Sequence, residues 1–323
     1  MDNTTLFFIS FLSGFLGAWG IMKYGDIIGI NDIPNNRSSH SQAIPKCGGI
    51  GVLLAFIFCS LMLSIPLYFW LPGLVLSLVS FWGDRFEITP KIRLLIQFAC
   101  AFIFLGGLFF TGQTEISGLF FLPLAVFITG TSNFYNFMDG IDGIAGITGC
   151  IAFFLLWVFN NLKGIDEIYG LFCIAMVFSC IGFLFFNMPK ARVFMGDVGS
   201  ILLGFIFSCL MIILSVSPMD FLIMAGFLFP FYLDELFSIA VRIRIKNSLF
   251  KPHRKHIYQL LANEMGIDHW KVSLGYAFSQ LLIGMALILA GSKGYPFLFL
   301  VYGITCTGFL FISLYVWKKV YCQ

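Results

Sequence analysis

The apolar runs of this chain constrain its fold more than any other feature. Charged residues are absent from several long segments, among them 6–22, 48–63, 94–110 and 175–186. Charged residues make up 11% of the chain and hydrophobic residues 59%, whereas a soluble domain averages about 25% charged residues. A bilayer core about 30 Å thick requires roughly 20 apolar residues per helix. The sequence therefore predicts an all-α polytopic membrane protein.

Polar breaks divide the apolar sequence into about eleven predicted spans. They lie near 4–22, 48–64, 67–83, 92–110, 119–137, 144–160, 168–186, 200–216, 220–241, 273–290 and 295–316. No basic segment precedes the first run, so we interpret it as a span and not as a cleaved signal. The nine cysteines lie mostly in apolar segments without a CxxC pair, which favours buried thiols. We expect one membrane domain over 1–323.

The basic residues orient the predicted spans. If the N-terminus is outside and the C-terminus cytoplasmic, the main cytoplasmic loops are 23–47, 84–91, 133–143, 187–199 and 242–272. Of the 19 Lys and Arg residues, only Lys163 and Lys293 fall on the opposite side. Positive residues accumulate on the cytoplasmic side of membranes. All four histidines fall in these loops as well, so we expect the chemistry on the cytoplasmic face.

A run of amides and carboxylates stands at the cytoplasmic end of the predicted span 119–137. It reads NFYNFMDGIDG and contains Asn133, Asn136, Asp139 and Asp142 at every third position. On one continuous helix these side chains would form a single polar stripe. Carboxylates at a membrane boundary are costly. The run therefore predicts a site for a metal, a phosphate-bearing substrate or a nucleobase, with a solvated helix end as the alternative.

A second motif, NMPKARVFMGDVGS, covers 187–200 immediately before a span. Asp197 stands between two glycines at a predicted helix start, where free backbone N–H groups bind anions. Mg²⁺ usually takes one or two protein carboxylates plus phosphate oxygens. Asp197 therefore fits a magnesium–diphosphate site, and a plain helix cap is the alternative.

Two more cytoplasmic segments precede these motifs in the chain. The segment FWGDRFE offers Asp84 as a base or as an organiser of a phosphate site. The first loop mixes turn-forming residues with Lys46, which either contacts phosphate or anchors the loop at the membrane surface. A pair of glycines, Gly48 and Gly49, opens the second span.

The long loop 242–272 carries a basic cluster. Its closely spaced donors His253, Arg254 and His256 suit a diphosphate clamp. A surface patch for anionic lipid is the alternative, worth about 1 kcal/mol per basic residue. Near the cytoplasmic end of the ninth span, Asp234 and Glu235 are predicted to pair with Arg242, two turns further on.

Taken together, these elements resemble the polyprenyl-phosphate N-acetylhexosamine-1-phosphate transferases, a superfamily that includes the phospho-MurNAc-pentapeptide translocases. The resemblance runs in order from about 31 to 260 and depends on PNNRSSH…PKCGG, GDRFE, NFYNFMDGIDG, NMPKARVFMGDVGS and HRKHIYQ. It implies ten or eleven helices, a cytoplasmic active site and one Mg²⁺, for which Mn²⁺ can substitute.

The resemblance also implies roles for single residues. Asp197 corresponds to the metal ligand. The implied catalytic residues are Asp84, Asp139, Asp142, His253, Arg254 and His256. The implied nucleotide-sugar-binding residues are Asn136, Asp142, Asn187, Phe194 and Lys46. The family usually has Asp-Asp where this chain has Gly83-Asp84, so any base function at this point depends on Asp84.

The loop variants narrow the implied reaction. The RSSH and HRKHIYQ sequences are similar to the branch that starts O-antigen or capsule synthesis, whereas phospho-MurNAc-pentapeptide transferases, the alternative, carry three consecutive histidines. The implied reaction moves N-acetylhexosamine-1-phosphate from a UDP-sugar to undecaprenyl phosphate and releases UMP. The lipid phosphate attacks directly, since its second pKa is near 6. A covalent aspartyl-phosphate on Asp139 or Asp84 is the other possible course.

The implied partners are UDP-N-acetylhexosamine, undecaprenyl phosphate and the lipid bilayer of a bacterial inner membrane. A homodimer is compatible with the sequence, and no nucleic-acid partner is expected. A membrane transporter is the main alternative from another functional class. It predicts internal repeats and ionisable residues near the middle of the bilayer. We find no clear repeat, and nearly all carboxylates lie at the cytoplasmic ends of spans.

Overall fold

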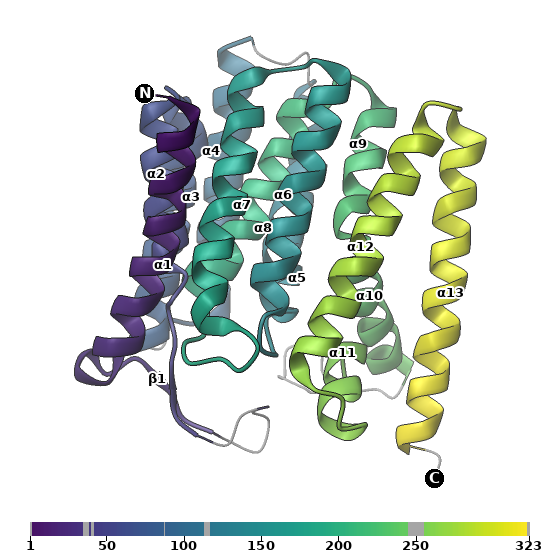
Figure 1. The fold of residues 1–323 in the computed structure, drawn as a ribbon. Helices are drawn as coiled ribbons and strands as arrows, with labels where there is room; N and C mark the ends of the chain where they lie inside the picture. Colours follow the sequence, from purple (N-terminus) through teal and green to yellow (C-terminus); the bar gives the residue numbers. More distant parts are fainter. Residues whose placement is uncertain are drawn as a thin grey trace.

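The protein is a bundle of helices that lie side by side (Figure 1). The computed structural model describes residues 2–34, 39, 42–86, 88–112, 117–244 and 255–321, with the backbone alone for residues 84 and 85. The first half of the bundle contains α1 (Asn3–Ile28), α2 (Ile50–Met62), α3 (Leu67–Arg85), α4 (Pro90–Phe110), the 3₁₀ turn η1 (Gly118–Phe120), α5 (Phe121–Phe137) and α6 (Ile144–Lys163).

The second half contains α7 (Glu167–Asn187), α8 (Asp197–Leu214), α9 (Pro218–Ala225), the 3₁₀ turn η2 (Gly226–Leu228), α10 (Phe229–Arg244), α11 (Ile257–Gln259), the π-helical turn η3 (Leu260–Glu264), α12 (His269–Gly291) and α13 (Tyr295–Tyr321). A small antiparallel hairpin of β1 (Asn31–Asp32) and β2 (Ile44–Pro45) follows α1. It pairs Asn31 with Pro45 and Asp32 with Ile44.

Nine of the described helical segments are long and apolar enough to cross a bilayer. Two shorter apolar helices, α2 and α3, complete the set. Each predicted span corresponds to one of these segments. The ninth span consists of α9, η2 and α10, and the fifth begins with η1. The prediction of an all-α polytopic fold is confirmed, and the chain is a multi-pass membrane protein.

Local sequence signals set several helix ends. The Asp166 carboxylate accepts hydrogen bonds from the backbone N–H groups of Ile168 and Tyr169 and so caps the start of α7. Gly29 and Gly164 end α1 and α6 in the left-handed conformation, with φ of 74° and 63°. The end of α6 lies close to the predicted end at residue 160, whereas α1 continues to Ile28, six residues into the predicted loop 23–47.

Helices α8 and α13 differ most in their surroundings. Helix α8 packs against α2, α3, α5 and α6, and nearly every residue along it is buried. Helix α13 lies at the edge of the bundle (Figure 1), and its described buried residues are Leu298, Ser313 and Val316. Large apolar side chains on its outer surface suit lipid contact.

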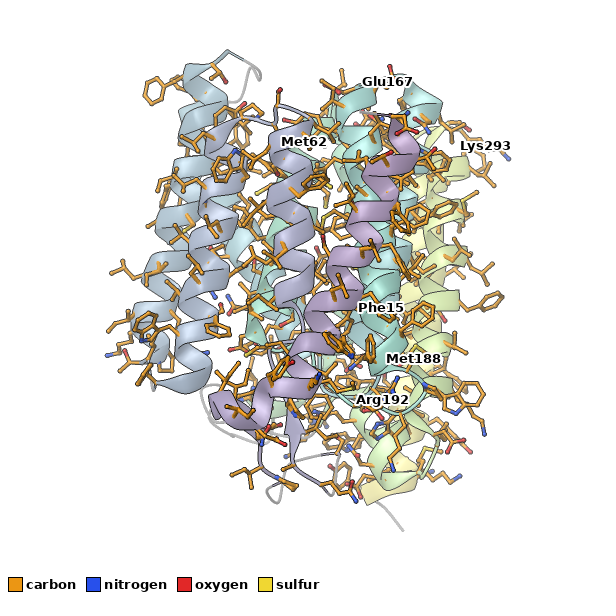
Figure 2. The ribbon with its side chains drawn as sticks, turned by 60° about the vertical axis from the view of Figure 1, so that its left-hand side comes forward. Phe15, Met62, Glu167, Met188, Arg192 and Lys293 are labelled. Carbon is orange, nitrogen blue, oxygen red and sulfur yellow. The ribbon has the colours of Figure 1, made fainter. Side chains whose placement is uncertain are left out.

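The two chain ends lie at opposite ends of the bundle (Figure 1). Figure 2 shows Met62, Glu167 and Lys293 at the end that carries the N-terminus, and Met188 and Arg192 at the other end. The β-hairpin, the turn between α5 and α6, the loop between α7 and α8, and α11 all lie at this second end. We call it the motif end.

Candidate active site

Backbone contacts join the first loop to the loop before α8. The N–H groups of Gly48 and Gly49 donate to the carbonyls of Phe194 and Met195 at 2.8 and 2.9 Å. Phe194 N–H in turn donates to the Pro45 carbonyl at 2.8 Å. A Cβ at either glycine would press into this neighbouring loop, which explains the glycine pair. The contacts bring Lys46 and Phe194, two predicted substrate-binding residues from distant motifs, to one place.

Asp197 begins α8 and is the centre of a polar cluster. Its Oδ1 accepts from Asn136 Nδ2 at 2.9 Å, and its Oδ2 accepts from Arg93 Nη1 at 2.6 Å. Asn136 Nδ2 also lies 2.9 Å from Ser200 Oγ. The N-cap position of α8 is Gly196, and Asp197 makes no capping bond. The capping alternative for Asp197 is therefore wrong. Its side chain is 26% exposed, so it can still meet a ligand.

Arg93 at the start of α4 is the residue that the sequence reasoning missed. Besides Asp197, it binds the Gly83 carbonyl through Nη2 at 3.0 Å. A Cβ added at Gly83 would lie 2.8 Å from Arg93 Nη2. Gly83 therefore leaves the space that Arg93 occupies. The available signal was a basic residue in the first turn of a span, ten residues after the glycine.

The turn between α5 and α6 corrects the predicted polar stripe. Helix α5 ends at Phe137, so Asn133 and Asn136 are helical, but Asp139 and Asp142 lie in the turn beyond it. Gly143, with φ of 83°, adopts a conformation that a continuing helix does not allow. Asn133 faces α4, where its amide exchanges hydrogen bonds with Gln97 at 2.6 and 3.3 Å. The run thus does not form one stripe, because its side chains contact different parts of the bundle.

Asp142 lies beside a second missed residue, His269 at the start of α12. Asp142 Oδ2 is 3.3 Å from His269 Nδ1, and the backbone N–H of Asp142 is 3.4 Å from the same nitrogen. Protonated Nδ1 donates to the carboxylate, whereas unprotonated Nδ1 accepts from the backbone. Ser273, one turn along α12, donates to the Asp142 carbonyl at 2.8 Å. Helix α12 therefore fixes the position of Asp142.

Asn187 joins two loops through its side-chain amide. Its Oδ1 accepts from Gly143 N–H and its Nδ2 donates to the Val193 carbonyl, both at 2.8 Å. The side chain is buried. This predicted nucleotide-binding residue therefore sets the relative position of the turn after α5 and the loop that carries Phe194.

Asp234 of α10 is the centre of a buried cluster, which we call the sealed cluster, with Glu235 and His256 among its members. Its carboxylate accepts from the N–H groups of Ile257 and Tyr258 at 2.7 and 3.1 Å, and from the Tyr276 hydroxyl. The predicted arginine partner, Arg242, is buried and acts on the charge of this cluster. The sequence did not indicate that Asp234 would bind the backbone of a segment beyond the loop.

Tyr258 connects this sealed cluster to the Asp139 turn. Its hydroxyl donates to the Phe137 carbonyl at 2.9 Å. Gly140 lies directly under the hydroxyl, and any Cβ at residue 140 would collide with it. Burial, followed by the charges of Asp234 and Asp139, raises the pKa of Tyr258 well above its usual value. Tyr258 therefore remains a neutral donor.

His256 is buried within the same cluster and is 4% exposed. Its Nδ1 is 3.5 Å from Asp234 Oδ1 and its Nε2 is 3.5 Å from Glu235 Oε2. Burial opposes the imidazolium charge, but the hydrogen bond to Asp234 and both carboxylate charges outweigh it, so the pKa of His256 is raised. The other two predicted clamp residues, His253 and Arg254, lie outside the described residues, as does the Asp84 side chain.

The chain resembles known proteins over most of its length. The model of the family described as glycosyl transferase family 4 matches residues 66–215. The chain is similar to the undecaprenyl-phosphate alpha-N-acetylglucosaminyl 1-phosphate transferase of Haemophilus influenzae. The two sequences are 30% identical over 277 residues, and this aligned region covers 79% of this chain and 78% of the relative. The chain belongs to glycosyl transferase family 4.

Other relatives carry the same name. The protein from Thermotoga maritima is 29% identical over 294 residues, and the aligned region covers 87% of this chain and 87% of the relative. The protein from Escherichia coli strain K12 is 30% identical over 267 residues, which is 74% of this chain and 71% of the relative. The predicted resemblance is confirmed. Members of this family are enzymes, so the transporter alternative is not supported.

The matched region of the family contains Asp197, Asn136 and both aspartates of the α5–α6 turn. Among the described residues, no three His, Cys, Asp or Glu side chains come together as a metal cage. An open site suits Mg²⁺, which needs one or two carboxylates and takes its remaining ligands from phosphate and water. The partly exposed Asp197 carboxylate fits such an ion and would hold it. The bound ion would neutralise charge on phosphate oxygens and polarise the phosphorus.

Proposed function

We propose that this protein transfers N-acetylglucosamine-1-phosphate from UDP-N-acetylglucosamine to undecaprenyl phosphate. The products are undecaprenyl-diphosphate-N-acetylglucosamine and UMP. Family membership and the shared name of the relatives support the reaction and the choice of this N-acetylhexosamine. The branch resemblance of the loops supports a first step in O-antigen or capsule-type polysaccharide synthesis.

One observation carries the proposal. Asp197, Asn136 and Arg93 come from three different helices and meet as a carboxylate, an amide and a guanidinium at one partly exposed point. A diphosphate with its metal ion requires such a mixture of anionic and cationic partners. A purely structural ion pair between these helices would not require the glycines that keep the surrounding loops close to it.

The chemistry needs positioning more than it needs a base. An oxygen of the lipid phosphate attacks the β-phosphorus of the UDP-sugar, the bond to the bridging oxygen breaks, and UMP leaves with that oxygen. The attacking phosphate is mostly dianionic at neutral pH because its second pKa is near 6. Holding two anionic groups in line therefore supplies most of the catalysis. Asp139 and Asp142, the latter oriented by His269, follow Asn136 in the turn after α5 and would act with this cluster.

The loop residues would bind or position the other parts of the UDP-sugar. Phe194, half-buried at the loop contact, would stack on the uracil ring, and Asn187 would hold its loop in place. Lys46 would meet the phosphate groups from the hairpin side. His253 and Arg254 would neutralise the remaining oxygens, and His256 would fix the end of their loop through Asp234.

An apolar cavity of about 370 Å³ near the motif end suits the lipid acceptor. It lies between α10, α12 and α13 and is lined mainly by apolar side chains, with Lys271 among them. Val272 and Tyr276 line it from α12, the helix whose His269 and Ser273 face Asp142. Part of the prenyl chain would lie here, and the remainder along the lipid-facing surface.

We place the motif end in the cytoplasm of a bacterial inner membrane, because most of the basic residues that the structure describes lie at that end. Glu167→Cys and Lys190→Cys, in a chain whose native cysteines are replaced, test this orientation, since both residues are exposed at opposite ends. A membrane-impermeant thiol reagent on intact cells should label position 167 and not position 190. Labelling at position 190 alone would contradict the orientation.

The test of the reaction is UMP release by the purified protein with undecaprenyl phosphate. UDP-N-acetylglucosamine should support release, whereas UDP-N-acetylgalactosamine and UDP-MurNAc-pentapeptide should support little. The radiolabelled sugar should appear in a lipid-linked product. UMP release with UDP-MurNAc-pentapeptide alone would favour the peptidoglycan alternative. Absence of release with every UDP-sugar, from protein that unfolds cooperatively, would contradict the proposed function.

A further inference from the structure

We propose that Arg93 is the built-in counter-cation of this site: it competes with a divalent cation for the Asp197 carboxylate and, once released, binds a substrate phosphate. The inference rests on the proposed function and adds a phosphate-binding residue to it. It concerns a residue outside all five motifs that indicated the family.

The contact geometry supports the competition. Arg93 Nη1 lies 2.6 Å from Asp197 Oδ2, while Asn136 occupies Oδ1. A divalent cation on Oδ2 would stand next to the guanidinium, and two positive charges at such a distance repel one another. Arg93 and the cation are therefore alternative partners of the same oxygen. The Arg93 side chain is 30% exposed, so it has room to move away.

Gly83 directs Arg93 toward Asp197. The guanidinium lies against the Gly83 backbone, and the position of an added Cβ is within 2.8 to 3.3 Å of three of its atoms. A side chain at residue 83 would therefore push the guanidinium out of its present place. The glycine and the arginine, on neighbouring helices, act as one unit.

Arg93 also has donor capacity left for a ligand. An arginine carries five N–H donors in a planar fork that matches phosphate. Two nitrogens bind Asp197 and Gly83, whereas the buried Nε has no hydrogen-bond partner among the described residues. A phosphate oxygen is the acceptor that such a guanidinium prefers. Its source is either the UDP-sugar or the lipid phosphate, because both must meet at this point.

Titration of the purified protein with Mn²⁺ in the absence of substrate, with free Mn²⁺ measured by EPR, tests the competition. Arg93→Gln should bind Mn²⁺ roughly two- to fivefold more tightly, the size expected for removing a partly exposed ion-pair partner. Gly83→Ala should shift the affinity in the same direction by displacing the guanidinium. Arg192→Gln, an exposed arginine at the motif end, is the matched control and should leave the affinity unchanged.

Steady-state kinetics of the same variants test the phosphate contact. Arg93→Gln should raise the KM for one substrate by about tenfold, the cost of a charge-assisted hydrogen bond. A rise for UDP-N-acetylglucosamine would assign Arg93 to the donor diphosphate, and a rise for undecaprenyl phosphate would assign it to the acceptor. Arg93→Lys keeps the positive charge but lacks the planar set of guanidinium N–H donors. Its Mn²⁺ affinity should therefore stay near that of the parent protein, while its KM should rise.

Weaker Mn²⁺ binding by Arg93→Gln would overturn the proposal, because Arg93 would then merely orient the carboxylate. Unchanged KM values for both substrates would overturn it as well. Asp197→Asn separates this failure from failure of the proposed function. If Asp197→Asn and the parent protein bind Mn²⁺ equally, the metal assignment falls and the Arg93 proposal falls with it. If Asp197→Asn abolishes Mn²⁺ binding and Arg93→Gln leaves it unchanged, only the Arg93 proposal falls.

Discussion

Two aspartates at the motif end, Asp197 and Asp234, have opposite surroundings. Asp234 is fully buried, and its carboxylate accepts two backbone N–H groups and a tyrosine hydroxyl. Asp197 is about a quarter exposed and is contacted by one amide and one guanidinium, both from side chains. The comparison indicates that a carboxylate with its lone pairs used inside the protein organises the fold, whereas one that stays open to solvent can bind a ligand.

The largest expected effect is at Asp197, the carboxylate that stays open to solvent. Asp197→Asn removes the charge that would hold the metal ion, so transfer should fall by about 1,000-fold or more, equivalent to several kcal/mol. The amide still accepts a hydrogen bond from Arg93, so the melting temperature should change by less than about 2 °C. A melting scan and a UMP-release assay on the same preparation measure both. Near-normal turnover at low Mg²⁺ would mean that Asp197 is not the metal ligand.

Substitution of the buried Asp234 should instead lower stability, and activity should fall only because less protein is folded. Asp234→Asn turns an NH₂ group toward donors that need an acceptor, which should destabilise the protein by about 3 kcal/mol. Thermal unfolding in detergent should show this loss, and activity should fall in proportion to the unfolded fraction. A fully stable but inactive Asp234→Asn protein would show that Asp234 acts in the chemistry, and the distinction between the two aspartates would be wrong.

The contact between Gly140 and Tyr258 links the Asp234 cluster to the turn that carries Asp139. Substitution at this contact should have a smaller effect on stability. Gly140→Ala should destabilise the protein by roughly 1 to 3 kcal/mol, because the new methyl group overlaps the Tyr258 hydroxyl. Tyr258→Phe removes that hydroxyl, so the double variant should be more stable than the two single losses predict. Gly130→Ala on α5 is the control, since no atom lies near its added Cβ. Strictly additive losses would mean that the two residues do not meet.

The smallest effect is a pH dependence in the sealed cluster. The pKa of His256 is raised in the folded protein, so the imidazolium stabilises the fold fully below the ordinary histidine pKa of about 6.5. That contribution is lost as the pH rises through the raised value. His256→Gln should therefore lower the melting temperature more at about pH 6 than at about pH 9. An equal loss at both values would mean that His256 is neutral in the folded state.

The spans were predictable because a bilayer imposes one rule on the whole chain. A helix must cover the apolar core with apolar residues, and its ends must be polar, so runs and breaks in the sequence correspond to helices and loops. The break inside the ninth span, between α9 and α10, was not predicted. Its residues are as apolar as their neighbours, and the 3₁₀ turn η2 depends on packing against α12.

The site was only partly predictable. Asp197 and Asn136 belong to separate motifs, yet they share a hydrogen bond, so grouping their motifs predicted their proximity. Asp139 and Asp142 were wrongly assigned to the same helix as Asn136, because the spacing of three residues continues past Phe137, where α5 ends. Periodicity describes residues that are helical and does not show where the helix stops.

The sequence by itself determined the class of fold, the set of motifs that gather at one end of the bundle, and the family. These follow from apolar runs, charge distribution and ordered motifs, which are all properties of neighbouring residues. The tertiary structure alone decided which carboxylate is sealed and which is open, and that Arg93 and His269 join the site. Those outcomes depend on contacts between residues that are 104 and 127 positions apart. Neighbouring residues in a sequence do not specify which distant side chains will meet.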